Sequence, residues 1–63
     1  MPISENIKKR RIELKMKQED LAEKVFVDRS MIAKIETGVK QPTLMLAKCI
    51  ADVFGCTVDD LLK

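Results

Sequence analysis

Residues 18–36 read QEDLAEKVFVDRSMIAKIE, and this stretch carries the clearest structural pattern in the chain. Its apolar positions describe two short helical faces with a break between them: Leu21, Ala22, Val25, Val27, Ile32 and Ile35. Successive residues of a helix are turned by about 100°, so Ile32 and Ile35 share one face and the polar side chains after the break share the opposite one. The stretch predicts two helices, Gln18 to about Val25 and Arg29 to Glu36, joined by a tight turn.

This arrangement is typical of a helix-turn-helix, which places its second helix in the major groove of DNA. The outward stripe of the predicted helix 29–36 contains Arg29, Ser30, Ala33 and Lys34. Arg29 offers a fork of donors to guanine O6 and N7, Ser30 can donate or accept, and Lys34 can reach a guanine or a phosphate. Ala33 is small enough to let the helix approach. An ordinary solvated helix face has the same composition, so the stripe alone leaves both interpretations open.

Three further helices complete the predicted fold, an all-α domain of five short helices. They are expected at residues 4–15, 44–54 and 57–62, and the breaks fall at Gly38, Pro42 and Gly55. Short polar residues stand where they can cap helix N-termini by accepting hydrogen bonds from free backbone amides: Ser4, Asp28, Thr43 and Thr57. Asp60 follows Thr57 by three residues, a spacing that favours a capping box.

The core is expected to be aliphatic, because Phe26 and Phe54 are the only aromatic residues. Besides the apolar positions of residues 18–36, two helices should contribute most of the core. These residues are Ile7, Ile12 and Leu14 from helix 4–15, and Leu44, Ala47, Ile50, Ala51 and Phe54 from helix 44–54. Cys49 and Cys56 are expected to be reduced and buried. Two cysteines in a chain without histidine form neither a disulfide framework nor a zinc site.

Length and charge restrict the possible functions. A chain of 63 residues fits one domain, 1–63, with little room for a catalytic pocket beside the core. It has no histidine and no glycine-rich phosphate loop, so we predict no enzyme, catalytic residue, metal or cofactor. Residues 1–41 hold 10 Lys/Arg and 7 Asp/Glu, a weak indication of an anionic partner. No apolar run suits a membrane span or a secretory signal, which predicts a cytoplasmic location in a bacterium, or for a phage-encoded protein in its host.

The chain resembles the phage-repressor and Cro-like helix-turn-helix family, also called Xre-like regulators. The resemblance runs from about Ile3 to Leu62 and covers apolar, capping and polar positions together. It is carried by Gln18, Leu21-Ala22, Val25, Val27, Arg29-Ser30, Ile32, Ile35-Glu36, Gly38, Pro42, Ile50-Ala51, Gly55 and Asp59–Leu62. It implies a lambda-repressor-like DNA-binding domain.

The resemblance also implies roles for single residues. The base-reading positions are those of Arg29, Ser30 and Lys34. The positions that contact the DNA backbone are those of Lys17, Gln18 and Lys40, and the position of Met31 contacts either the backbone or a base edge. Gln18 also matches a position that braces a side chain of the recognition helix. Arg11 and Glu36 match a mostly buried structural ion pair, which accounts for an arginine on the core side of helix 4–15.

Two residues depart from the family pattern. Phe26 stands in the turn, where the family usually has glycine, and a left-handed conformation there costs another residue roughly 1–2 kcal/mol. Either the turn differs, or the ring packs well enough to offset the strain, or Phe26 is an exposed anchor for a second subunit. Lys17 stands where serine or threonine is common, which predicts a poorer helix cap and a stronger charge contact with DNA.

The predicted function is sequence-specific transcriptional regulation, as a repressor that binds double-stranded DNA as a homodimer. A dimer is expected because one such helix reads only a few base pairs. Candidates for the dimer surface are Val39, the start of helix 44–54, and Leu61-Leu62. The alternative is an antitoxin-like or adaptor module of the same fold that binds another protein. No membrane contact or small-molecule ligand is predicted.

Overall fold

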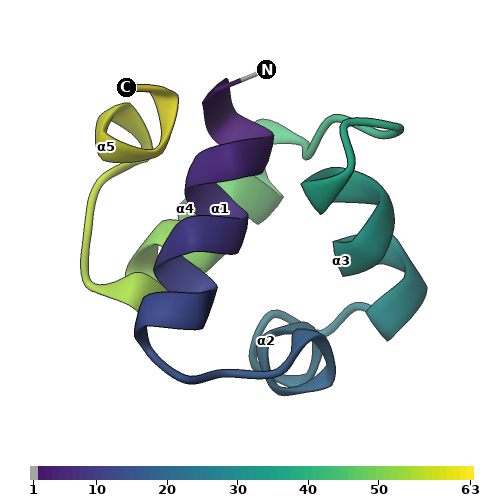
Figure 1. Ribbon diagram of the computed structural model, residues 1–63. Coiled ribbons are helices and arrows are strands. Elements are labelled where there is room, and N and C mark those ends of the chain that lie inside the picture. The colour runs from purple at the N-terminus through teal and green to yellow at the C-terminus, as the bar shows by residue number, and fades with distance from the viewer. Residues whose placement is uncertain (1) are drawn as a thin grey trace.

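A computed structural model of the chain describes residues 2–63, and these residues form five helices and no strand. The helices are α1 (Pro2–Glu13), α2 (Gln18–Lys24), α3 (Arg29–Glu36), α4 (Leu44–Phe54) and α5 (Val58–Leu62). The predicted all-α fold, with a helix-turn-helix in α2 and α3, is confirmed. Figure 1 shows α1 in the middle of the domain, with α5 on one side and α3 on the other.

Short polar side chains begin three of the helices, as the sequence predicts. Asp28 Oδ1 accepts a hydrogen bond from the Met31 amide at 2.9 Å, and Thr43 Oγ1 accepts one from the Leu46 amide at 3.1 Å. Thr57 and Asp60 form the predicted capping box. Thr57 Oγ1 accepts from the Asp60 amide at 3.1 Å, and Asp60 Oδ2 accepts from the Thr57 amide at 3.0 Å. These bonds satisfy backbone amides that have no partner inside the helix.

The start of α1 differs from the prediction. Ser4 is not an N-cap but lies inside α1, which begins at Pro2, where the missing N–H of proline costs nothing because first-turn amides have no partner within the helix. The Ser4 side chain is buried and its hydroxyl has no hydrogen-bond partner. At the other end, α1 stops at Glu13 instead of residue 15, and Lys15 takes a left-handed conformation with φ 58°.

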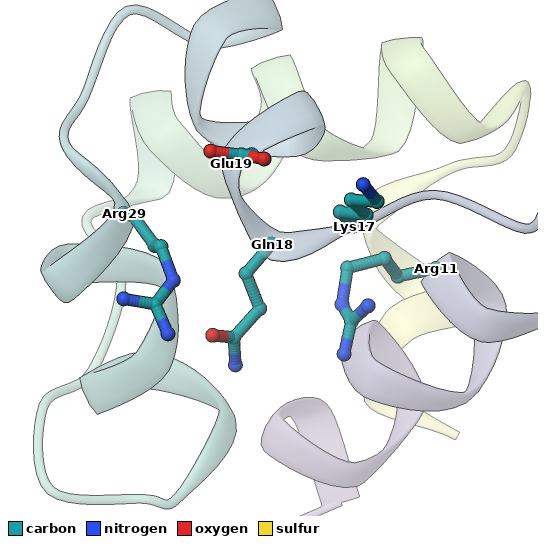
Figure 2. Close-up of a pocket in the computed structure, with 5 residues that line it drawn as sticks. All are labelled: Arg11, Lys17, Gln18, Glu19 and Arg29. Carbon is teal, nitrogen blue, oxygen red and sulfur yellow. The ribbon is translucent and has the colours of Figure 1, made fainter.

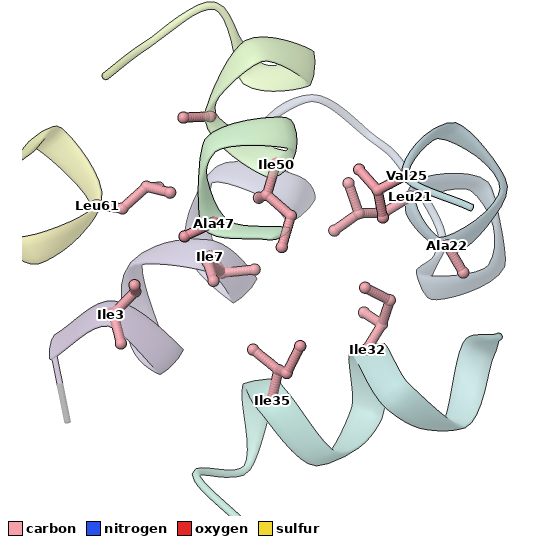
Figure 3. Close-up of a cluster of buried hydrophobic side chains, with 11 residues drawn as sticks. Ile3, Ile7, Leu21, Ala22, Val25, Ile32, Ile35, Ala47, Ile50 and Leu61 are labelled. Carbon is pink, nitrogen blue, oxygen red and sulfur yellow. The ribbon is translucent and has the colours of Figure 1, made fainter. Parts of the chain in front are cut away.

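The core is a cluster of aliphatic side chains from all five helices. It consists of Ile3, Ile7, Leu21, Ala22, Val25, Ile32, Ile35, Ala47, Ile50, Ala51 and Leu61. Figure 3 shows Ile7, Ile32, Ile35 and Ile50 pointing toward one another between α1, α3 and α4. Because the two helices of the helix-turn-helix bury their apolar faces in this cluster, their polar faces are held outward.

Several predicted core positions lie at the surface instead. Ile12 and Leu14 are about half exposed and Leu44 is 77% exposed. The buried stripe of α1 runs through Ile3 and Ile7 to residue 11, and Ile12 lies a quarter turn away from it, while Leu14 follows the end of the helix. Leu44 is in the first turn of α4 and is left at the surface.

The two cysteines are also less buried than predicted. Cys49 is exposed, because the inward stripe of α4 passes through Ala47, Ile50 and Ala51. Cys56 is half-buried against the core. Within the described residues, the helices are all too short or too polar to cross a membrane.

Candidate nucleic-acid interface

A buried ion pair joins α1 to the end of α3. Arg11 Nε donates to Glu36 Oε2 at 2.6 Å, and Arg11 Nη2 donates to Glu36 Oε1 at 3.1 Å. Arg11 Nη1 donates to the Met16 carbonyl at 2.7 Å. The side chains are 11% and 2% exposed, respectively. The pairing that the family resemblance implies is therefore present as a two-point contact, in which most donors of the guanidinium are used inside the protein.

Gln18 attaches α2 to the same carboxylate. Its Nε2 donates to Glu36 Oε1 at 3.1 Å, so Glu36 accepts two hydrogen bonds from Arg11 and one from Gln18. One buried carboxylate thus connects three helices. The resemblance implies that Gln18 braces a side chain of α3, and the side chain that it contacts here belongs to the last residue of that helix.

Lys17 precedes α2 at the N-cap position and supplies no oxygen to cap it. The local hydrogen bond runs the other way, because Asp20 Oδ2 accepts from the Lys17 backbone amide at 2.9 Å. The Lys17 side chain is exposed. Its ammonium group can therefore extend from the surface toward an anion without breaking a contact that holds the helix.

The outward stripe of α3 contains the residues predicted to read bases. Arg29, Ser30 and Lys34 are all exposed, on the side of α3 away from Ile32 and Ile35. Ser30 Oγ donates to Asp28 Oδ1 at 3.0 Å, so its hydroxyl proton is used while its oxygen can still accept. The Met31 amide, and then the Ser30 hydroxyl, hold the pKa of Asp28 below its ordinary value. The cap that orients the start of α3 is therefore a carboxylate at neutral pH.

Met31 and Lys40, the two other residues with predicted DNA contacts, lie close to this stripe. Met31 is half-buried against the core, with part of its side chain at the surface. Lys40 is exposed in the loop after α3, and its backbone amide donates to the Lys34 carbonyl at 3.2 Å. The loop thereby folds back on the end of α3, which brings Lys40 near the stripe.

A shallow pocket of about 450 Å³ lies at the start of α2 and α3. Its lining residues are Arg11, Lys17, Gln18, Glu19 and Arg29. Figure 2 shows Arg11 and Arg29 extending from opposite sides, with the Gln18 amide between them. Cationic and amide donors of this kind bind phosphate oxygens. Arg11 and Glu19 are not predicted from the sequence to belong to this surface, because its lining comes from three separate segments that only the tertiary fold brings together.

The conformation of the turn between α2 and α3 excludes two of the three alternatives for Phe26. Phe26 has φ 61°, in the left-handed region, so the turn keeps the geometry for which glycine is usual. The residue is 94% exposed, so the ring does not pack against the domain. Within the described chain, ring packing therefore does not offset the backbone strain.

The fold and this exposed stripe define the class of protein: a helix-turn-helix domain with a polar recognition helix. Residues 7–61 match the helix-turn-helix family model. The chain belongs to the helix-turn-helix family, in its Xre or phage-repressor branch. The chain is 37% identical over 63 residues to the transcriptional activator BcrR of Enterococcus faecalis, a match that covers 100% of this chain and 31% of BcrR. It thus spans about a third of the length of that relative.

Solved structures show the same fold. The P22 c2 repressor in complex with a synthetic operator has a TM-score of 0.93 and 28% identity, over 100% of this chain and 96% of that one. SinR in complex with DNA has a TM-score of 0.89 and 29% identity, over 97% and 98%. The fold also matches 32% of the hydroxypropylphosphonic acid epoxidase from S. wedmorenis, with a TM-score of 0.86, 30% identity and 95% of this chain covered.

Proposed function

We propose that the chain is a sequence-specific DNA-binding transcriptional repressor that places α3 in the major groove of a two-fold operator. The observation that carries the proposal is the single exposed face that combines the α3 stripe with the cationic pocket beside it. Solved structures with this fold that hold DNA or an operator support it. A regulator of this kind works in the cytoplasm, beside the chromosome.

Base reading is assigned to Arg29, Ser30 and Lys34. Arg29 is the first residue of α3, and the N-terminal part of a recognition helix is the part that contacts base edges. Lys34 follows five residues later, about 7.5 Å along the helix at 1.5 Å per residue. That length corresponds to roughly two base-pair steps of the duplex. One copy of α3 therefore reads a short half-site.

Backbone contact is assigned to Lys17, Gln18, Met31 and Lys40. Lys17 and Gln18 line the pocket at the start of α2, and Lys40 is held near the end of α3. We therefore expect backbone contacts near the beginning and near the end of the base-reading stripe. Such contacts fix the register of a protein on the duplex without reading its sequence.

A second copy of the chain is the proposed partner on DNA. Three apolar residues of the α3–α4 loop and the first turn of α4 are exposed: Val39 by 76%, Leu44 by 77% and Met45 by 78%. Leu62 is 53% exposed, whereas Leu61 is fully buried and therefore does not belong to the surface. A stable interface buries about 800 Å² on each partner, more than three side chains provide. The dimer is therefore expected to form on DNA.

A protein-interaction module is the second candidate, and the exposed ring of Phe26 favours it. A non-glycine residue held in a left-handed turn without internal packing lowers the stability of the domain. Contact between the ring and a partner protein would offset that loss. This function can coexist with DNA binding, since Phe26 belongs to the turn and not to the α3 stripe.

Selection of bound sequences from a random duplex pool tests the proposed function. We expect a two-fold symmetric consensus whose half-sites are about one helical turn, 34–36 Å, apart. Affinity for a random duplex, measured by fluorescence anisotropy, should fall steeply with salt because phosphate contacts release counterions. Absence of binding to any duplex would overturn the proposal and leave the protein-interaction function.

A further inference from the structure

Glu19 is the acidic residue among the five that line the pocket. Its side chain is exposed, and neither ion pair seen in residues 2–63 involves it. Figure 2 shows it on α2, next to Gln18 at the edge of a pocket otherwise lined by donors. We infer that Glu19 weakens contact with the DNA backbone and so sets how strongly binding depends on sequence. The inference rests on the proposed DNA binding.

The charge balance of the pocket supports a large local effect of Glu19. The charge of Arg11 is compensated by Glu36, to which it is bonded at 2.6 Å. Lys17 and Arg29 then contribute two positive charges and Glu19 one negative charge, which leaves one net positive charge. Without Glu19 the local charge is twice as large. A phosphate placed in this pocket is therefore held much less strongly than the number of cations suggests.

The consequence for DNA recognition follows from what each contact reads. Backbone attraction is the same for every sequence and dominates non-specific binding. An acidic side chain in the lining of the pocket lowers the attraction to the DNA backbone for all duplexes. The contacts of the α3 stripe therefore account for a larger share of the total affinity. Repulsion placed against unwanted partners is a general means of specificity.

A purely structural role for Glu19 predicts the opposite result. Glu19 lies in the first turn of α2, where a negative charge interacts favourably with the helix dipole. Loss of that interaction would slightly weaken the helix and would lower DNA affinity or leave it unchanged. An increase in affinity therefore distinguishes backbone repulsion from helix stabilisation.

The test compares Glu19→Gln with wild type and with Glu5→Gln on a random-sequence duplex, by anisotropy over a range of salt. Glu5 is also exposed and also lies in the first turn of its helix, but at the end of α1 that is far from α2 (Figure 1). The control therefore makes the same change in net charge away from the pocket. We expect Glu19→Gln to bind about threefold to fivefold more tightly at low salt, the size of one unit charge at close range in water.

The advantage of Glu19→Gln should shrink as salt rises, and Glu5→Gln should stay much closer to wild type. If wild type binds duplex DNA and Glu19→Gln is no tighter than Glu5→Gln, the inference is overturned and the proposed function stands. If wild type binds no duplex, the proposed function itself is overturned, and this inference with it.

Discussion

Gln18 and Glu36 lie at opposite ends of the helix-turn-helix and are joined by a hydrogen bond of 3.1 Å. The first residue of α2 is thereby attached to the last residue of α3, in addition to the turn that connects the two helices. Arg11 completes the arrangement from α1 through the same carboxylate. The angle between α2 and α3 is therefore determined by a buried polar contact as well as by packing, and it sets the direction in which the α3 stripe faces.

Removal of Arg11 should destabilise the domain strongly. Arg11→Ala leaves the Glu36 carboxylate buried without its charged partner, which costs about 3–5 kcal/mol. A domain of this size has a stability of roughly the same amount, so the variant should be largely unfolded at 25 °C. Circular dichroism and thermal unfolding measure this directly.

Two further variants control for that result. Lys9→Ala removes an exposed cation from the same helix and should leave the melting temperature nearly unchanged. The double variant Arg11→Met with Glu36→Leu removes both charges and should recover much of the stability. An Arg11→Ala protein as stable as Lys9→Ala would contradict the structural role of the ion pair.

Loss of the Gln18 amide should affect stability modestly and DNA binding more. Gln18→Ala removes one partly buried hydrogen bond to Glu36, at a cost of about 1 kcal/mol in the free energy of unfolding. It also removes a proposed backbone contact from the pocket. Urea unfolding and anisotropy on a selected operator give the two quantities. If folded Gln18→Ala binds the operator with the same affinity as wild type, Gln18 does not contact DNA.

Arg29 and Lys17 should give different signatures on DNA. If Arg29 contacts guanine, Arg29→Ala costs about 1–3 kcal/mol of binding free energy and relaxes preference at one base position. Lys17→Ala should weaken binding to all sequences alike and reduce the salt slope by about one. Affinities over a set of single-base operator variants measure both. If Arg29→Ala instead weakens binding to all operator variants alike, Arg29 contacts a DNA phosphate at the pocket that it helps to line.

Glycine at position 26 should stabilise the domain. Phe26 holds φ 61° and is 94% exposed, so Phe26→Gly relieves roughly 1–2 kcal/mol of backbone strain and loses no packing. Greater freedom of the unfolded chain offsets part of this gain, and a net of about 1 kcal/mol is expected.

Phe26→Ala separates the two contributions at this position. Alanine removes the ring but keeps the strain, since it also disfavours positive φ, so its stability should stay close to that of wild type. Equal stabilisation by alanine and glycine would show that the ring, and not the backbone, is unfavourable in the free domain. Thermal unfolding of the three proteins decides between these outcomes.

Stability should fall in acid because of two cap carboxylates. Backbone amides lower the pKa of Asp28 and of Asp60 in the folded protein, through Met31 and Thr57 respectively. A lowered folded pKa contributes stability that is complete above the unfolded value of about 3.9 and is lost as pH falls through the folded value. Asp28→Asn keeps a good cap without a titrating group. Its free energy of unfolding, measured with urea, should therefore fall less than that of wild type below about pH 4. Parallel losses in the two proteins would exclude this contribution of Asp28.

Local chemistry made most of the helix ends predictable. Asp28, Thr43 and Thr57 act within three residues of their own positions, so their capping bonds depend on the sequence alone. The predicted cap at Ser4 is wrong because capping also depends on the residues just before the cap. A serine that can cap does so only if the chain before it is not helical, and here α1 continues back to Pro2.

The sequence predicted less well which face of each helix is buried. Apolar periodicity located the inward faces of α2 and α3, but Ile12 and Leu44 are exposed. Which side of a helix is covered depends on where its neighbours cross it, and that crossing is decided by all five helices together. The same holds for Cys49, whose residue type favours burial and whose position on α4 faces outward.

The five helices, the caps of α3, α4 and α5, and the polar stripe on α3 follow from the sequence alone, because turn chemistry and helical periodicity act over a few residues. Packing of the whole domain is what brings Arg11 and Gln18 to the buried Glu36 carboxylate, and what places Glu19 in the lining of the same pocket as Arg29. These groups are distant in the chain. Their meeting depends on how the apolar faces of α1, α2 and α3 pack, which no short stretch of residues specifies.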